Sequence, residues 1–180
     1  MGVKKFLGFS IFVALQGAAV QMTDQWLVAN VLPQGAAGFS WVAFLAWATY
    51  FFSGCTVKGG VTSFLSFTAG IATAVAIILM GGYLSPLGFF AFPAAIVLAV
   101  TFCMYLEKVP WFNSIPSVFI ACGAFFGLMN YVPGATFFYS GAVVLLYGAM
   151  GLVSGFISIW FREKYENFGK EEVAADFGEE

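Results

Sequence analysis

This sequence has no histidine, and only 9% of its 180 residues are charged. Its three cysteines, Cys55, Cys103 and Cys122, are too widely spaced for a metal site that would have no histidine to complete it. We therefore expect them to be small buried side chains. Ligands for a porphyrin or quinone are lacking, as is a basic platform for nucleic acid. The sequence predicts no metal, no cofactor and no nucleic-acid partner.

Ionisable side chains are scarce along the apolar part of the chain, where residues 6–161 include Asp24, Lys58, Glu107 and Lys108 as the only formal charges. Asp24 and Glu107 are expected on opposite sides of a membrane, so neither a carboxylate pair nor a nucleophile beside a base is available. The sequence thus predicts a protein that is not an enzyme. Proton-coupled or sodium-coupled carriers usually hold an ionisable residue at mid-depth, and we expect none here.

What the sequence has in abundance is apolar residues, at 61% of the chain with a mean hydropathy of +0.92. This composition is that of an integral membrane protein. Runs such as "TAVAIILMGG" do not alternate between apolar and polar residues, as the strands of a membrane barrel would. We therefore predict an all-α fold, with helices that satisfy their own backbone groups in lipid.

Six apolar segments are expected to cross the membrane, approximately at residues 6–22, 37–54, 59–82, 86–106, 115–130 and 136–161. We predict that the first ends near Gln21 or Met22, because Asp24 would be costly in lipid, and that Trp26 lies at the outer interface. The start of the chain also has the plan of a signal peptide, which we interpret as a retained first helix. The prediction is one six-helix domain over residues 1–161.

The positive charges predict the orientation of these six segments. With six crossings, every lysine and arginine falls on one side of the membrane: Lys4, Lys5, Lys58, Lys108, Arg162, Lys164 and Lys170. The positive-inside rule makes that side cytoplasmic, with both termini inside. The acidic segment 162–180 is then a cytoplasmic tail, which we interpret as a short helical extension and a solvated end, with docking of a cytoplasmic protein as the alternative.

Small residues recur at helical spacing in two places. Glycines of the last segment repeat every seven residues, with one more between them: Gly141, Gly148, Gly151 and Gly155. A second step, Gly123 and Gly127, echoes Gly70 and Ala74 at an offset of 53 positions, through a repeat or by chance. Such faces let helix backbones approach closely, either within one protomer or between protomers of a homo-oligomer.

Hydroxyl groups form a stripe on the third segment, where Thr62, Ser66, Gly70 and Thr73 share one face. With Ser117 of the fifth segment they are candidates for the lining of a narrow solute path. The alternative is that these hydroxyls bond to their own helix or to a neighbouring one. Interhelical hydrogen bonds are likewise expected for Gln16, Tyr139, Tyr147 and Ser154.

Two stretches resemble a known family: "WVAFLAWATYFFSGCTVKGGVTSFLSFTAGIATAVAIIL" and, after two helices, "SIPSVFIACGAFFG". An aromatic and small-residue helix, a Gly-Gly turn and a Pro-Ser helix start are similar to those of the small membrane proteins grouped as domain of unknown function 1097. The resemblance implies a bacterial inner-membrane location and a compact multi-helix fold. It brings no active site with it.

Two functions remain open at this point. The first is a passive channel or facilitator for a small neutral solute or weak acid, working as a homo-oligomer in the lipid bilayer. The second is a membrane scaffold or accessory subunit that binds other proteins through its glycine faces and its tail.

Overall fold

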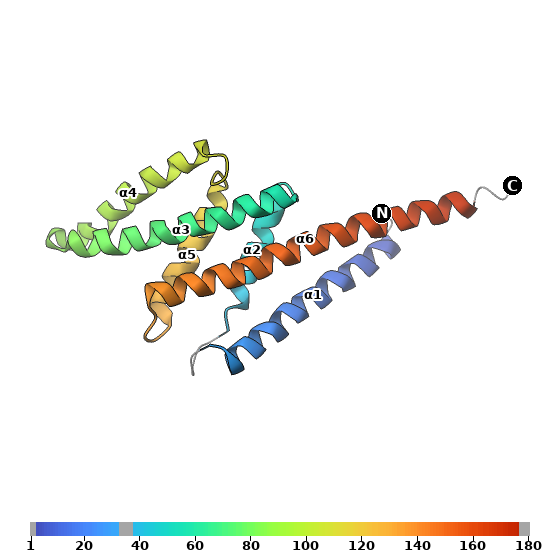
Figure 1. Cartoon of the computed structure of the whole chain (residues 1–180), viewed down its shortest axis with the longest axis horizontal. Coiled ribbons are helices and arrows are strands. Elements are labelled where there is room, and N and C mark those ends of the chain that lie inside the picture. Colours follow the sequence, from blue (N-terminus) through green and yellow to red (C-terminus); the bar gives the residue numbers. More distant parts are fainter. Residues whose placement is uncertain (1–2, 33–37, 177–180) are drawn as a thin grey trace.

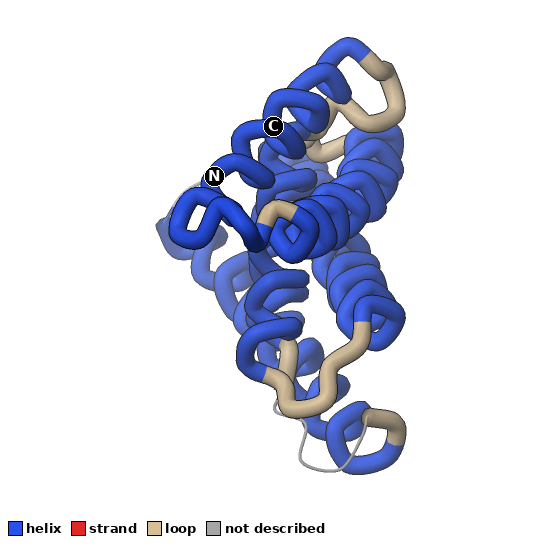
Figure 2. The backbone as a smooth tube through the Cα atoms, turned by 90° about the vertical axis from the view of Figure 1, so that its left-hand side faces the viewer, coloured by secondary structure: helices blue, strands red, loops and turns tan. Residues whose placement is uncertain are grey.

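The computed structural model describes residues 3–32 and 38–176, with side chains over 6–32 and 38–167. All six apolar segments form helices, which confirms the all-α prediction (Figures 1 and 2). Their bounds are α1 Val3–Asn30, α2 Ser40–Phe52, α3 Val57–Tyr83, α4 Ala91–Met104, α5 Ile115–Tyr131 and α6 Phe137–Asp176. Two 3₁₀ turns flank α4, η1 at Ser85–Phe90 and η2 at Tyr105–Lys108.

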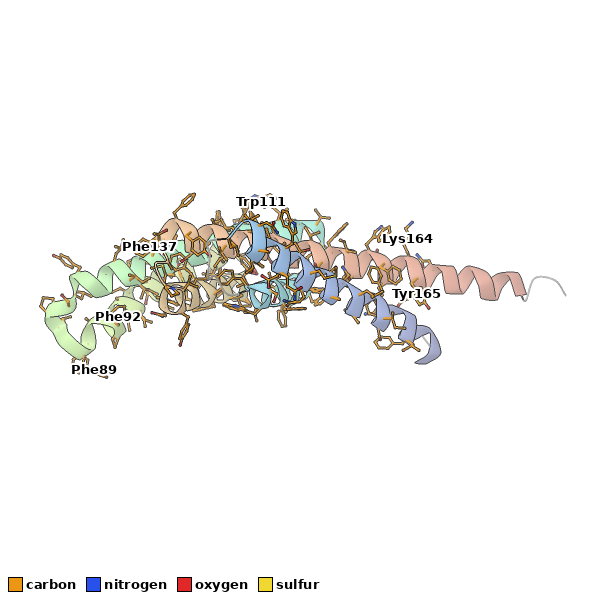
Figure 3. All side chains as sticks on the ribbon, turned by 90° about the horizontal axis from the view of Figure 1, so that it is seen from below. Phe89, Phe92, Trp111, Phe137, Lys164 and Tyr165 are labelled. Carbon is orange, nitrogen blue, oxygen red and sulfur yellow. The ribbon has the colours of Figure 1, made fainter. Side chains whose placement is uncertain are left out.

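Four of the helical stretches are long and apolar enough to cross a membrane: Phe6–Asn30, Val57–Tyr83, Ser85–Lys108 and Phe137–Asn167. The helices α2 and α5 have 13 and 17 residues, or about 20 and 26 Å at 1.5 Å per residue, less than a hydrocarbon core of about 30 Å. Large apolar side chains are widely exposed, among them Phe89, Phe102 and Phe138 (Figure 3 labels Phe89). The chain therefore has the surface of a membrane protein.

The predicted end of the first segment is wrong. The helix α1 continues past Met22 to Asn30, and Asp24 is only 2% exposed. The chain can bury this carboxyl group because the Tyr147 hydroxyl of α6 and the Phe39 backbone amide both donate hydrogen bonds to it. Trp26, on the same helix, is exposed.

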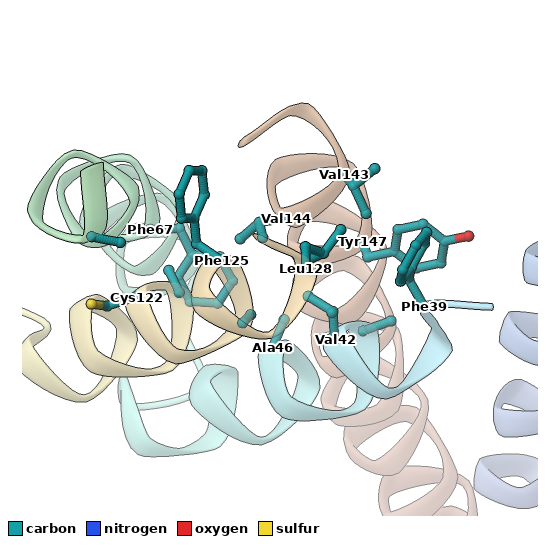
Figure 4. Close-up of a cluster of buried hydrophobic side chains, with 14 of the residues drawn as sticks. Phe39, Val42, Ala46, Phe67, Cys122, Phe125, Leu128, Val143, Val144 and Tyr147 are labelled. Carbon is teal, nitrogen blue, oxygen red and sulfur yellow. The ribbon is translucent and has the colours of Figure 1, made fainter. Parts of the chain in front are cut away.

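The core lies where α2 packs against α6 and α3 packs against α5 (Figure 4). Two glycines of α6 make the contact with α2 close: a Cβ at Gly151 would overlap the carbonyl oxygen of Ala43, and a Cβ at Gly155 would overlap the Tyr50 side chain. A third, Gly148, lies against α3, where a Cβ would overlap the Phe67 ring. These glycines therefore pack against other helices of the same chain.

The remaining small residues have different surroundings. A Cβ added at Gly141 or Gly127 would make ordinary contacts, 3.5 Å from side-chain atoms of Ile71 and Trp41, and one at Gly123 would meet no described atom within 4 Å. Gly70, by contrast, lies directly against the Val118 carbonyl oxygen of α5. Gly70 and Gly123, which occupy corresponding places in the 53-residue echo, thus do not share a packing role.

The helix α1 lies along α6 (Figure 1), and polar contacts hold it there. Gln16 donates to the Ser154 carbonyl oxygen at 3.1 Å and accepts from the Ser158 hydroxyl at 2.8 Å, which confirms the interhelical hydrogen bond expected at Gln16. Among the described side chains of α1, Val20 and Asp24 alone are buried. The helix is therefore attached to the rest of the molecule by few groups.

Past residue 161 the helix α6 continues to Asp176 and projects beyond the other helices (Figure 1). Arg162 and Glu166 form an ion pair across one turn at 3.0 Å. The helical extension of the tail is thus longer than the short extension that the sequence predicts.

Candidate functional site

A pocket of about 500 Å³ opens where the amino-terminal ends of α3 and α5 meet the carboxyl-terminal end of α2. Ten residues line it: Phe52, Ser53, Thr56, Lys58, Gly59, Thr62, Pro110, Asn113, Ser114 and Pro116. Most of these carry hydroxyl, amide or ammonium groups. The lining is thus polar in a chain whose helices are otherwise apolar.

Local sequence explains the two helix ends at this pocket. Thr56 caps α3, its hydroxyl accepting from the Gly59 amide at 3.0 Å. Pro116 occupies the first turn of α5, where its missing N–H costs no hydrogen bond, and Ser114 is the N-cap residue. The Ser114 hydroxyl, however, bonds to the Ser117 hydroxyl at 2.7 Å and not to a backbone amide.

Four serine hydroxyls lead from the pocket into the protein. We call Ser53, Ser63, Ser114 and Ser117 the serine cluster. The Ser53 oxygen lies 2.5 Å from that of Ser63 and 3.4 Å from that of Ser114, and Ser63 and Ser117 are fully buried. The cluster connects the pocket wall with the interface between α3 and α5, and its hydroxyls can each donate or accept for a polar solute.

The electrostatics of the pocket favour negative charge. Lys58 belongs to the lining, with its ammonium group 6.0 Å from the centre of the Trp111 ring. Two helix amino-terminal ends face the same space and add positive partial charge. No lining residue is acidic.

The structure separates the five residues of the candidate path. Thr62 lines the pocket, and Ser117 reaches it through Ser114. Ser66 is buried one turn further along α3, whereas the Thr73 hydroxyl bonds to the Ala69 carbonyl oxygen at 2.8 Å. Along α3 the pocket lining ends at Thr62, and at Gly70 the contact with Val118 closes this face.

Ser66 carries a buried hydroxyl that has no hydrogen-bond partner among the described residues. An unpaired buried polar group costs about 1–3 kcal/mol, so Ser66→Ala should leave thermal stability in detergent unchanged or raise it. Ser117→Ala, which removes the partner of Ser114, should lower stability by about 0.5–1.5 kcal/mol. Thermal unfolding of both variants measures the difference. Equal losses would mean that Ser66 has a partner.

Sequence reasoning missed two parts of this arrangement. The first omission is the pocket: Ser53, Asn113 and Ser114 lie between helices, and Lys58 lies in the first turn of α3. The predicted helix starts were the available signal. The second omission is the buried contact of Asp24 with Tyr147, for which an ionisable residue beside an apolar run was the signal.

The fold and the site define an all-helical membrane protein with a polar pocket at one end of its core. Residues 25–163 match the model of a family described as Protein of unknown function (DUF1097). The chain belongs to this family, as its aromatic and small-residue helices suggest. No curated protein and no solved structure matches it.

Proposed function

We propose that this protein is a facilitator for a small polar solute, with weak acids and their anions as the preferred class, and that it is not an enzyme. The observation that carries the proposal is the pocket lined by Lys58 and hydroxyl groups, which continues into the serine cluster. Anions are attracted by helix amino-terminal ends and by an ammonium group. The hydroxyl groups form hydrogen bonds with the solute in place of some of the water molecules that it loses on entering the pocket.

The proposed setting is a bacterial inner membrane, with six crossings and both termini in the cytoplasm. Antiparallel packing of α1 on α6 supports this topology, since Phe12 stacks on Phe161 near one end and Asp24 meets Tyr147 further along. Lys58 and the pocket then face the cytoplasm. The closed contact at Gly70 requires α3 and α5 to separate before a solute passes. The open side of Gly123 is available to a second protomer.

The test is solute flux into proteoliposomes, followed by stopped-flow light scattering. We expect faster entry of formate and acetate than into empty liposomes, with a smaller effect on urea, glycerol and ammonia. Folding is checked on the same sample by thermal unfolding. Well-folded protein that accelerates none of the five solutes would contradict the proposal.

The alternative function is a scaffold that binds a cytoplasmic protein. The projection of α6 beyond the other helices favours it, because it presents a charged helix away from the core. Deleting residues 168–180 distinguishes the two functions: a facilitator keeps its flux, whereas a scaffold has no flux to lose.

A further inference from the structure

The face of α3 that borders the polar pocket carries one polar side chain in each of its first three turns. Lys58 is exposed in the first turn, Thr62 follows one turn later and Ser66 one turn after that, each step being about 6 Å along the helix axis. Lys58 and Thr62 line the pocket, whereas Ser66 is buried beyond its lining. A charged group is therefore followed by uncharged hydroxyl groups along a single helix face.

The protein does not use the hydroxyl groups of this face for its own hydrogen bonds. Thr68 and Thr73, further along α3, donate to carbonyl oxygens of the same helix at 2.6 and 2.8 Å. No such bond is found for Thr62 among the described residues, although only 7% of Thr62 is exposed, and Ser66 likewise has no partner among them. An unpaired hydroxyl group is unfavourable inside a protein. The Thr62 hydroxyl is thus available to a hydrogen-bonding group in the pocket.

The cation at the outer end of this face is also available. The ion pairs found among the described side chains involve Lys108 and Arg162, and no acidic residue lines the pocket beside Lys58. The first turn of α5 borders the same space, and its N-cap residue Ser114 makes no side-chain hydrogen bond to the helix backbone. This helix start adds partial positive charge. An anionic group is therefore favoured between Lys58 and the start of α5.

A solute that satisfies both ends of this face has a negative charge at one end and a hydroxyl group at the other. Acetate meets the first requirement alone, because its methyl group cannot form a hydrogen bond with Thr62. We propose that the pocket selects short hydroxycarboxylates, such as glycolate and lactate, with the carboxylate at Lys58 and the solute hydroxyl at Thr62. Ser66 is the next partner for that hydroxyl once α3 and α5 separate. This proposal rests on the facilitator function proposed above and narrows its solute class.

Propionate is the matched solute for glycolate, because a methyl group takes the place of the hydroxyl group. The test measures uptake of each labelled acid by proteoliposomes that contain the full chain, after uptake by empty liposomes has been subtracted. We expect glycolate to enter about tenfold faster than propionate, since the Thr62 hydroxyl stays unpaired when propionate is bound. Glycolamide, which keeps the hydroxyl group but has no charge, should also enter more slowly than glycolate.

Thr62→Val is the matched variant, because a methyl group replaces the hydroxyl group on a side chain of similar size. It should lower glycolate uptake to near that of propionate and leave propionate uptake unchanged, whereas Thr62→Ser should keep the preference. Lys58→Gln should remove the difference between glycolate and glycolamide. The control is Thr73→Val, whose hydroxyl bonds to Ala69 outside the pocket lining, and it should keep the solute preference of the parent protein.

The outcomes separate this proposal from the facilitator function. If the parent protein accelerates glycolate and propionate equally, the facilitator function stands and the proposed solute class is wrong. A glycolate preference that persists in Thr62→Val would also overturn the proposal, because another group would then recognise the hydroxyl. If folded protein accelerates none of the acids, the facilitator function and the proposal fail together. The comparison of solutes in the parent protein decides the matter even where a variant does not fold.

Discussion

Replacing Gly151 with alanine is expected to lower the free energy of unfolding by about 1–3 kcal/mol or more, the usual cost of overpacking a core. The new methyl group would overlap the Ala43 carbonyl oxygen and approach the Ala46 side chain on α2. A backbone carbonyl cannot rotate away as a side chain can. The two helices must therefore separate, with a loss of many small dispersion contacts.

Gly123→Ala is the matched control for this substitution. Gly123 lies inside α5, but a Cβ there would meet none of the described atoms within 4 Å, so the same methyl group enters open space. Since alanine is the better helix former, its effect should be neutral or a gain of about 1 kcal/mol at most. Thermal unfolding in detergent compares the two variants. Equal losses would show that the contact of Gly151 with α2 does not determine stability.

Replacing Thr62 with tryptophan is expected to reduce weak-acid flux by about tenfold or more, which corresponds to about 1.4 kcal/mol on the barrier to entry. Thr62 lines the pocket beside Lys58 and Ser114, and a large ring there fills the space that a solute would occupy. Initial rates of acetate entry in proteoliposomes measure the effect. Equal amounts of reconstituted protein are required.

The control is Val61→Trp, one residue earlier on α3. Val61 is 45% exposed and lies outside the polar pocket lining, so the same ring should meet lipid and leave the flux near that of the parent protein. If both variants kept the acetate entry rate of the parent protein, the pocket would be excluded as the entry site. Equal losses would indicate a general disturbance of α3.

Much of the helical architecture was determined by the sequence, because apolar runs and their interruptions are local properties. Hydropathy alone predicted six helices, and their observed bounds differ by only a few residues for α3 and α5. Glycine spacing on α6 predicted a smooth face, since a missing Cβ allows close approach whatever the partner. Hydropathy did not predict that α1 extends past Asp24. The cost of burying the Asp24 carboxyl group depends on the hydrogen-bond donors around it, which hydropathy does not describe.

Tertiary structure decided the polar sites. Asp24 is buried through a hydroxyl 123 residues away and a backbone amide 15 residues away, and no local pattern joins these groups. The serine cluster likewise combines Ser63 of α3, Ser117 of α5 and the residues that cap two helices, Ser53 after α2 and Ser114 before α5. The sequence did not predict the partner of Gly151 either, because a face of small residues can pack against many different helices. Sequence thus determined which surfaces can pack or bind, whereas the position of each helix in space decided what they meet.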